Sequence, residues 1–254
     1  MRSSVEERER AFFDRHYGEG AWNPTGIRLR LKREVAALRR MTGGRRLGCV
    51  LSIGCGEGLF ECMLAPHADS VLGIDLSAEA IESARRNEAG RGLRNVEFRC
   101  QPLSELRLDE RFDGIVCLAF LHHVPEAELP GLLASLHAQL RPGGFFFARD
   151  PSRRGMLRAF GRRVLGAHYD RYHSPDEREL DAEELTAQLR ANGFASVEIG
   201  WIDLTLIPGH YLFPRAGAWL MYLFAGIDRL FCALPFARWA SGFTVLATRS
   251  GEPS

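Results

Sequence analysis

Three groups of residues have types and spacings that suit chemistry on a bound small molecule. Three alternating glycines stand in VLSIGCGEG at 50–58, an acid follows at Asp75, and two adjacent histidines stand at 122 and 123. Glycine permits positive φ and carries no Cβ, so such a loop lets the backbone approach a ligand closely. An acid about 20 residues after a glycine-rich turn is typical of α/β units that bind ribose hydroxyls. The pattern therefore predicts a ribose-containing cofactor.

The glycine spacing narrows the class of cofactor. Gly54, Gly56 and Gly58 give GxGxG, whereas dinucleotide sites read GxGxxG because the third glycine lets a helix begin close beneath a pyrophosphate. Glu57 stands between the last two glycines, where its carboxylate would repel a pyrophosphate but attract the ammonium group of an amino-acid moiety. The loop thus disfavours a nicotinamide dehydrogenase.

The elements that must position these residues alternate between apolar runs and helix-compatible segments. Ser77 is a candidate helix N-cap, and PGG at 142–144 is expected to end a helix before the fifth strand. The alternation predicts an α/β fold with a mostly parallel sheet covered by helices on both faces. The predicted strands lie near 49–54, 71–75, 95–99, 112–119, 143–149, 195–202 and 242–248.

Two further segments, FDGIVCLAFLHHV at 112–124 and LRPGGFFFARD at 140–150, follow the glycine loop and VLGIDLS at 71–77. With these four ordered motifs the chain resembles the class I S-adenosylmethionine-dependent methyltransferases, in the small-molecule group with a paired-His LHHV segment. The resemblance covers about residues 49–150 strongly and the C-terminal part weakly. It implies a Rossmann-like seven-stranded sheet whose last strand is antiparallel and follows a helical insertion.

The resemblance implies S-adenosyl-L-methionine as cofactor and S-adenosyl-L-homocysteine as product. Asp75 would accept hydrogen bonds from both ribose hydroxyls, and Leu76 would lie against the adenine. Gln101 stands where many relatives place an acid at the adenine amino group, and its amide oxygen can accept the same hydrogen bond. No residues have metal-ligand spacing, so no metal is expected. The residues expected at the cofactor are Tyr17, Gly54, Cys55, Gly56, Glu57, Asp75, Leu76, Gln101 and Leu118.

His122, His123 and Asp150 are the candidates for the chemical step. The histidines follow the fourth strand and Asp150 ends the fifth, so all three are expected at the sheet edge where open α/β folds bind ligands. Methyl transfer requires alignment and, for a hydroxyl acceptor, removal of its proton. Imidazole titrates near neutral pH, so one histidine is expected to act as general base with Asp150 orienting it. Packing of the pair against the cofactor is the alternative.

The chain is expected to form one compact domain. An N-terminal helical cap or lid, residues 1–46, is predicted to lie on a methyltransferase domain of residues 47–254. Within that domain, 151–180 and 204–240 are predicted to be insertions on the substrate side. The segment 204–240 is the most apolar, and its longest apolar run is too short to span a bilayer. A hydrophobic lid, a homodimer or membrane-surface contact, and plain packing stay open for it. The expected substrate contacts are His168, Tyr169, Tyr172 and His173.

The composition of the chain limits its expected partners, location and class of function. A formal net charge of +1 gives no global attraction to nucleic acid or to an anionic membrane. Six dispersed cysteines without a CxxC pair favour reduced thiols, and no apolar signal segment is evident, so a cytoplasmic location is expected. We predict a small-molecule O-methyltransferase of secondary or cell-envelope metabolism that acts on a lipophilic acceptor. The alternatives are an RNA or protein methyltransferase and a non-catalytic cofactor-binding partner subunit.

Overall fold

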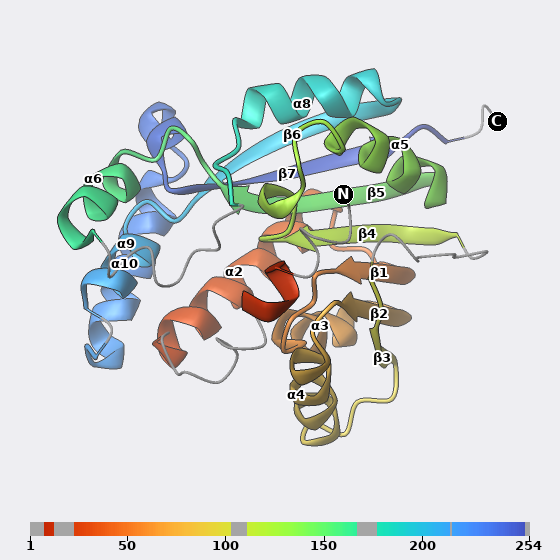
Figure 1. Ribbon diagram of the computed structural model, residues 1–254, viewed down its shortest axis with the longest axis horizontal. Helices are drawn as coiled ribbons and strands as arrows, with labels where there is room; N and C mark the ends of the chain where they lie inside the picture. The colour runs from red at the N-terminus through yellow and green to blue at the C-terminus, as the bar shows by residue number, and fades with distance from the viewer. Residues whose placement is uncertain (1–7, 13–22, 103–110, 167–176, 214, 252–254) are drawn as a thin grey trace.

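The computed structural model describes residues 8–12, 23–102, 111–166, 177–213 and 215–251. Its centre is a seven-stranded sheet of order β3-β2-β1-β4-β5-β7-β6 (Figure 1). Strands β1 to β5 are parallel, whereas β7 lies between β5 and β6 and is antiparallel to both. The predicted Rossmann-like sheet and its antiparallel last strand are confirmed. The strands are β1 (Cys49–Ile53), β2 (Ser70–Asp75), β3 (Val96–Cys100), β4 (Phe112–Leu118), β5 (Leu140–Pro151), β6 (Phe194–Ile202) and β7 (Gly242–Arg249).

Helices cover both faces of the sheet because side chains alternate along each strand. On β1, Val50 packs in the apolar cluster of α2 (Pro24–Met41), α3 (Leu59–Leu64) and α4 (Ala78–Ala89). Leu51 and Ile53 pack in the opposite cluster, with α5 (Leu129–Gln139) and α8 (Ala182–Ala191). The three layers confirm the expectation of a sheet buried on both faces.

The remaining helices gather at the sheet end where β5 and β6 finish (Figure 1). Helix α6 (Met156–Leu165) follows β5, while α9 (Leu206–Leu212), α10 (Ala218–Phe231) and the 3₁₀ turn η4 (Pro235–Trp239) connect β6 to β7. Helix α9 contacts both α6 and α10, and α10 contacts α2. Within the described part of the chain, none of these helices is long and apolar enough to cross a membrane.

One boundary differs from the prediction. Helix α5 ends at Gln139 and β5 begins at once with Leu140, so the PGG segment at 142–144 lies inside the strand. The prediction was wrong because Arg249 replaces a glycine cap: its guanidinium donates to the carbonyl oxygens of His137, Ala138 and Leu140 at the helix end. The N-cap prediction for Ser77 is confirmed, since its Oγ accepts a hydrogen bond from the Ala80 N–H at 3.2 Å.

Candidate cofactor and acceptor site

The loop between β1 and α3 has the backbone conformation that its glycines predict. Gly54, Gly56 and Gly58 all have positive φ, at 69°, 53° and 68°. A Cβ built on Gly54 would lie 2.8 Å from Cδ2 of Phe120, so this glycine also allows close approach of the segment after β4. Any larger residue at Gly54 would therefore meet both an unfavourable dihedral and a steric clash.

Asp75 ends β2 directly beside this loop. One of its carboxylate oxygens accepts a hydrogen bond from the Gly56 N–H at 2.8 Å, and the other accepts from the Ser77 N–H at 3.0 Å. The carboxylate is half-buried, and carboxylate oxygens are the acceptor type that ribose hydroxyls require. The Gln101 N–H donates to the Asp75 carbonyl oxygen at 2.9 Å, which brings Gln101 to the same edge.

The other residues predicted at the cofactor lie around this edge. Cys55, Glu57, Leu76 and Leu118 are all half-buried. Burial raises the pKa of the Cys55 thiol well above its usual value, so the sulfur stays protonated near neutral pH. The Glu57 carbonyl oxygen accepts a hydrogen bond from Asn87 Nδ2 at 3.0 Å, which fixes the loop against α4. Tyr17 lies outside the described residues.

The paired histidines form the 3₁₀ turn η3 (Leu121–His123) after β4. His122 Nδ1 lies 2.8 Å from Asp150 Oδ1, and the His122 backbone N–H donates to the same oxygen at 3.2 Å. Both residues are buried, with 6% of His122 and 0% of Asp150 exposed. Of the predicted catalytic residues, the structure brings this pair into direct contact.

His123 has different surroundings. Its ring lies 4.0 Å from the His122 ring, centroid to centroid, and its Nδ1 lies 3.0 Å from Glu9 Oε2. Burial opposes the charged imidazolium, but contact with Glu9 and the negative charges of Glu177 and Asp150 outweigh it and raise the pKa of His123. His123 is thus biased toward the protonated form, which is the wrong form for a general base.

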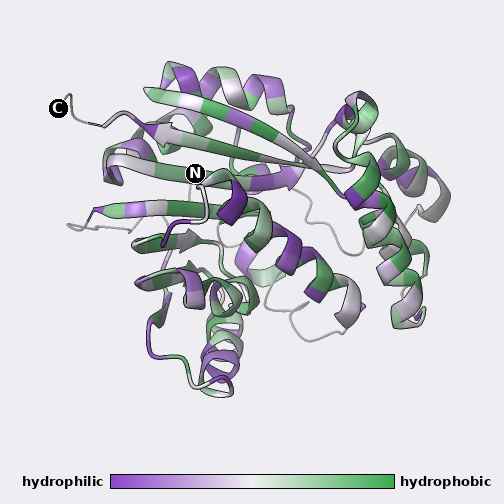
Figure 2. Ribbon diagram, turned by 180° about the vertical axis from the view of Figure 1, so that it is seen from behind, coloured by the Kyte–Doolittle hydropathy of each residue, from purple (hydrophilic) through white to green (hydrophobic). Residues whose placement is uncertain are grey.

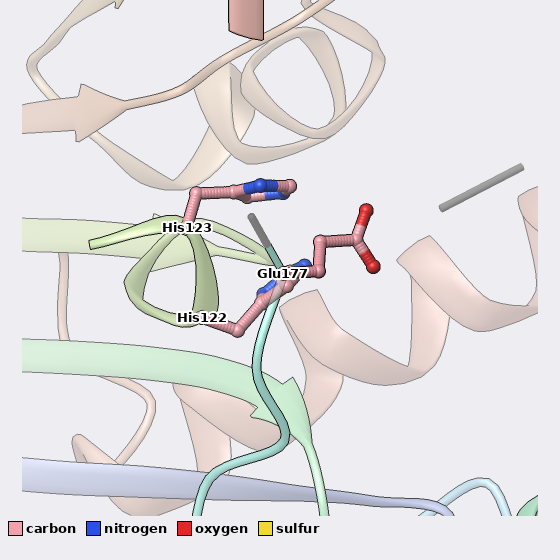
Figure 3. A group of neighbouring side chains, drawn as sticks. All are labelled: His122, His123 and Glu177. Carbon is pink, nitrogen blue, oxygen red and sulfur yellow. The ribbon is translucent and has the colours of Figure 1, made fainter. Parts of the chain in front are cut away.

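Glu177 completes a group of three polar side chains with the two histidines (Figure 3). One nitrogen or oxygen atom from each residue lies within 4.8 Å of the others. The Arg178 N–H donates to the His122 carbonyl oxygen at 3.0 Å, and this hydrogen bond holds the Glu177 segment against η3. Imidazole and carboxylate are metal-ligand types, so the expectation of no metal stays a prediction at this group.

Burial dominates the electrostatics of Asp150. It raises the pKa of this carboxyl to about 7, although Arg149, the His122 N–H, His123 and Arg178 all favour the charged form. The Asp150 carboxyl therefore titrates near neutral pH, while it lies in contact with His122.

A buried ion network supports this edge from the α2 side. Arg149 Nε lies 2.8 Å from Glu34 Oε1, which also lies 3.3 Å from Arg30 Nε. Arg30 in turn lies 3.2 Å from Asp203 Oδ2, after β6. Because the network joins α2 to the ends of β5 and β6, it fixes the strand that carries Asp150.

The sequence analysis did not identify Glu9, Glu34 or Glu177. The position of Glu34 could have indicated a buried charge, since it lies three residues after Leu31 and four before Leu38, on the apolar stripe of α2. Glu9 and Glu177 carried no such signal, because only the tertiary fold brings them to the histidines. The predicted substrate contacts His168, Tyr169, Tyr172 and His173 lie outside the described residues.

Comparisons with known proteins show which sequences and folds this chain is similar to. Residues 50–144 match the model of a family described as "Methyltransferase domain". The ubiquinone biosynthesis O-methyltransferase of Coxiella burnetii is 31% identical over 159 residues, which span 58% of this chain and 63% of that protein. The match therefore covers less than two thirds of that relative's length.

Two further comparisons extend over more of the chain. The protein of the same name from Rhodopseudomonas palustris is 28% identical over 209 residues, 72% of this chain and 80% of the relative. The solved complex of DhpI with SAH superposes with a TM-score of 0.61 at 22% identity and covers 98% of both chains. At 22% sequence identity, this similarity shows that the two chains share a fold.

Proposed function

We propose that this chain, which belongs to the class I S-adenosylmethionine-dependent methyltransferases, transfers a methyl group to a hydroxyl of a small lipophilic acceptor, with His122 as general base. The observation that carries the proposal is the buried contact between His122 Nδ1 and Asp150 Oδ1 at 2.8 Å. It lies at the same sheet edge as the glycine loop and Asp75.

The described residues fit the cofactor. Gly54 and Gly56 hold the loop at positive φ, and Asp75 presents beside it a carboxylate, the acceptor type that ribose hydroxyls require, positioned by two N–H groups. Gln101 is hydrogen-bonded beside it and is a candidate for the adenine contact. When bound, S-adenosylmethionine supplies an electrophilic methyl group, so the protein needs no further activation of the donor.

The protein's part is then to hold the acceptor and to accept its proton. The Asp150 carboxylate accepts a hydrogen bond from Nδ1–H of His122 and so leaves Nε2 as a proton acceptor. The carboxylate also stabilises the imidazolium that forms when Nε2 takes the hydroxyl proton. Contact with Glu9 raises the pKa of His123 against the effect of burial, so His123 favours the charged form of Asp150 more than a neutral neighbour would.

Two observations support a lipophilic hydroxyl acceptor. The curated relatives named above are ubiquinone biosynthesis O-methyltransferases. In addition, the helices that follow β5 and β6 carry exposed apolar side chains at the edge where the histidines stand. A pocket for such an acceptor would include the segment of His168, Tyr169, Tyr172 and His173, which remains a prediction.

The proposal is tested with methyl-labelled S-adenosylmethionine and two matched acceptors, a lipophilic catechol and the corresponding aniline. We expect label in the ether product of the catechol and none in the aniline, because the proposed base acts by removing a hydroxyl proton and gives a neutral amine no comparable activation. Label in the aniline alone, or in RNA or protein substrates alone, would overturn the assignment to oxygen. The Asp150→Asn variant is the matched control, because it keeps the side-chain shape and removes the carboxylate.

A further inference from the structure

Exposed apolar side chains are confined to one end of the molecule. Among the described residues, every large apolar side chain that is exposed belongs to 156–160 or to 212–239. These residues lie in or next to α6, α10 and η4, which lie together where β5 and β6 end (Figure 1). A concentration of this kind is typical of an interaction surface, because soluble proteins rarely expose large contiguous apolar patches.

A helix on the surface of a water-soluble protein normally turns its apolar side toward the core and its polar side toward solvent. Helix α10 has the reverse arrangement. Trp219, Tyr222, Leu223 and Leu230 are 69%, 61%, 51% and 66% exposed, and their spacing places them on one side of the helix. Asp228 is fully buried, where it accepts hydrogen bonds from Arg33 Nη1 at 3.0 Å and from the Thr205 hydroxyl at 2.7 Å. Figure 2 shows α10 as mostly hydrophobic along its length.

Helix α6 has the same reversal. Met156 and Phe160 are 61% and 62% exposed, whereas Arg158 points inward with its Nε 3.2 Å from Glu179 Oε1. An open hollow on this helix is lined by Ala159, Phe160, Arg162 and Arg163, so apolar and cationic groups lie side by side. Because α9 contacts both α6 and α10, the two apolar stripes belong to one end of the molecule.

The charges on this face have one sign. In the described residues of 153–166 and 204–240, the single acidic residue is the buried Asp228. Arg153, Arg154 and Arg158 pair with acids of the segment 179–184. Four exposed arginines have no carboxylate partner within the described part of the chain: Arg163, Arg215, Arg229 and Arg238. The near-neutral net charge of the whole chain thus conceals a local cationic face.

We propose that the face formed by α6, α10 and η4 docks on the surface of an anionic lipid bilayer. Segments that insert shallowly at a membrane surface are rich in tryptophan, tyrosine and leucine beside arginine. Their apolar side chains enter the lipid, while their guanidinium groups bind lipid phosphates. In η4, the Arg238 guanidinium lies 4.9 Å above the Trp239 ring, so a cation and an aromatic ring are already paired. The helices are too short to span the bilayer, which fits a surface contact.

Charge also favours lipid over a second copy of the chain. A two-fold symmetric contact sets a face against itself, so it would bring arginines toward arginines with no exposed acid among them. An anionic bilayer offers the complementary charge over the whole face. The residues of the docking face lie outside the proposed catalytic and cofactor-binding residues, and the test does not use activity as the readout.

The test is co-sedimentation of the full chain with vesicles of phosphatidylcholine alone and of phosphatidylcholine with phosphatidylglycerol in equal amounts. We expect binding to the anionic vesicles at least tenfold tighter than to the neutral ones, and loss of most of this preference in about 0.5 M NaCl. Two variants should each weaken binding at least tenfold. One is the triple variant Trp219→Ser, Tyr222→Ser and Leu223→Ser, and the other is the double variant Arg229→Glu and Arg238→Glu.

The matched control is Arg94→Glu with Arg190→Glu, which makes the same charge change at exposed arginines just before β3 and at the end of α8, and it should leave vesicle binding unchanged. Circular dichroism and S-adenosylmethionine titration verify that each variant is folded.

Equal binding of the control and the docking-face variants would overturn the proposal, as would absence of binding to anionic vesicles. A dimer in light scattering that the triple serine variant dissociates would likewise overturn it, because a second copy would then cover the face. Docking by a protein that transfers no methyl group would leave this proposal standing and overturn only the proposed function.

Discussion

His122 Nδ1 and Asp150 Oδ1 lie 2.8 Å apart, although 28 residues separate them in the sequence. The contact follows from the sheet: β4 and β5 are parallel neighbours, and their pairing ends with Leu118 beside Arg149, so the next residues of both strands meet. The carboxylate orients the imidazole and makes it the best candidate for a base among the described residues.

Replacement of His122 by alanine should slow turnover about 10²–10⁴-fold, the usual contribution of a general base. S-adenosylmethionine affinity should change little, because the imidazole is not needed to hold the ribose. The measurement is kcat with a saturating acceptor, together with calorimetric affinity for the cofactor. His137→Ala is the control that removes a histidine away from the site, because His137 lies in the last turn of α5 against Phe194 at the start of β6. An unchanged kcat in His122→Ala would assign the paired histidines to packing.

The rate should depend on pH through the His122–Asp150 pair. Burial raises the pKa of Asp150 to about 7, so below this pH its carboxyl is increasingly protonated and no longer accepts the hydrogen bond that leaves Nε2 of His122 as the proton acceptor. We expect kcat/KM to rise with pH and to level off above about pH 7. In Asp150→Asn, kcat/KM should be lower at every pH, and the pH at which kcat/KM rises should shift. A flat profile in the unmodified enzyme would contradict the pair's role.

Glu61 gives a separate prediction about stability. It is buried in α3, its Oε1 accepts a hydrogen bond from Ser52 Oγ at 2.6 Å, and burial raises its pKa from 4.5 to about 7. Between those two pH values the folded chain holds a proton that the unfolded chain has lost, so the free energy of unfolding falls as pH rises. The fall is complete above about pH 7 and amounts to about 3 kcal/mol.

Glu61→Gln keeps an acceptor for Ser52 and cannot ionise, so it should be more stable than the unmodified chain at pH 8 by about this amount and similar to it at pH 5. Urea denaturation at the two pH values measures the difference. Glu82→Gln, at an exposed carboxylate of α4, is the control and should show no such gain. A Glu61→Gln variant that is less stable at pH 8 would show that the buried charge is tolerated.

Removal of metal should leave activity unchanged. His122 and His123 direct Nδ1 toward Asp150 and Glu9, and His123 is biased toward the protonated form, which cannot bind a metal. Dialysis against EDTA followed by rate measurement and elemental analysis tests this expectation. Loss of activity that a divalent cation restores, and that Glu177→Gln also abolishes, would instead make the group of His122, His123 and Glu177 a metal centre.

The sequence predicted the sheet well because each strand is a short apolar run between clear turn signals, as in VLSIG and VLGID. It also predicted that His122 and Asp150 share an edge, since parallel strands end together. It did not predict that Glu9 would distinguish the two histidines, because contacts between distant segments carry no local signal. The start of β5 was misplaced for a related reason: Arg249 caps α5 from the far end of the chain.

The segment 204–240 shows the limit of composition. Its apolar character favoured a lid and left an interface and plain packing open, and the difference depends on which side of α10 faces outward. Trp219 and Tyr222 face outward while Asp228 is buried, a distribution that only the fold reveals. The division into a cap of residues 1–46 and a domain of 47–254 stays a prediction.

The most direct test of the central claim is calorimetric titration of the purified chain, and of its Asp75→Ala variant, with S-adenosylmethionine, S-adenosylhomocysteine and NAD. We predict micromolar binding of the first two and none of NAD. Affinity should fall at least about 100-fold in Asp75→Ala, because two charge-assisted hydrogen bonds are lost. Asp69→Ala, which removes an acid at the opposite end of β2, should bind normally. Binding of NAD, or unchanged affinity in Asp75→Ala, would contradict the account.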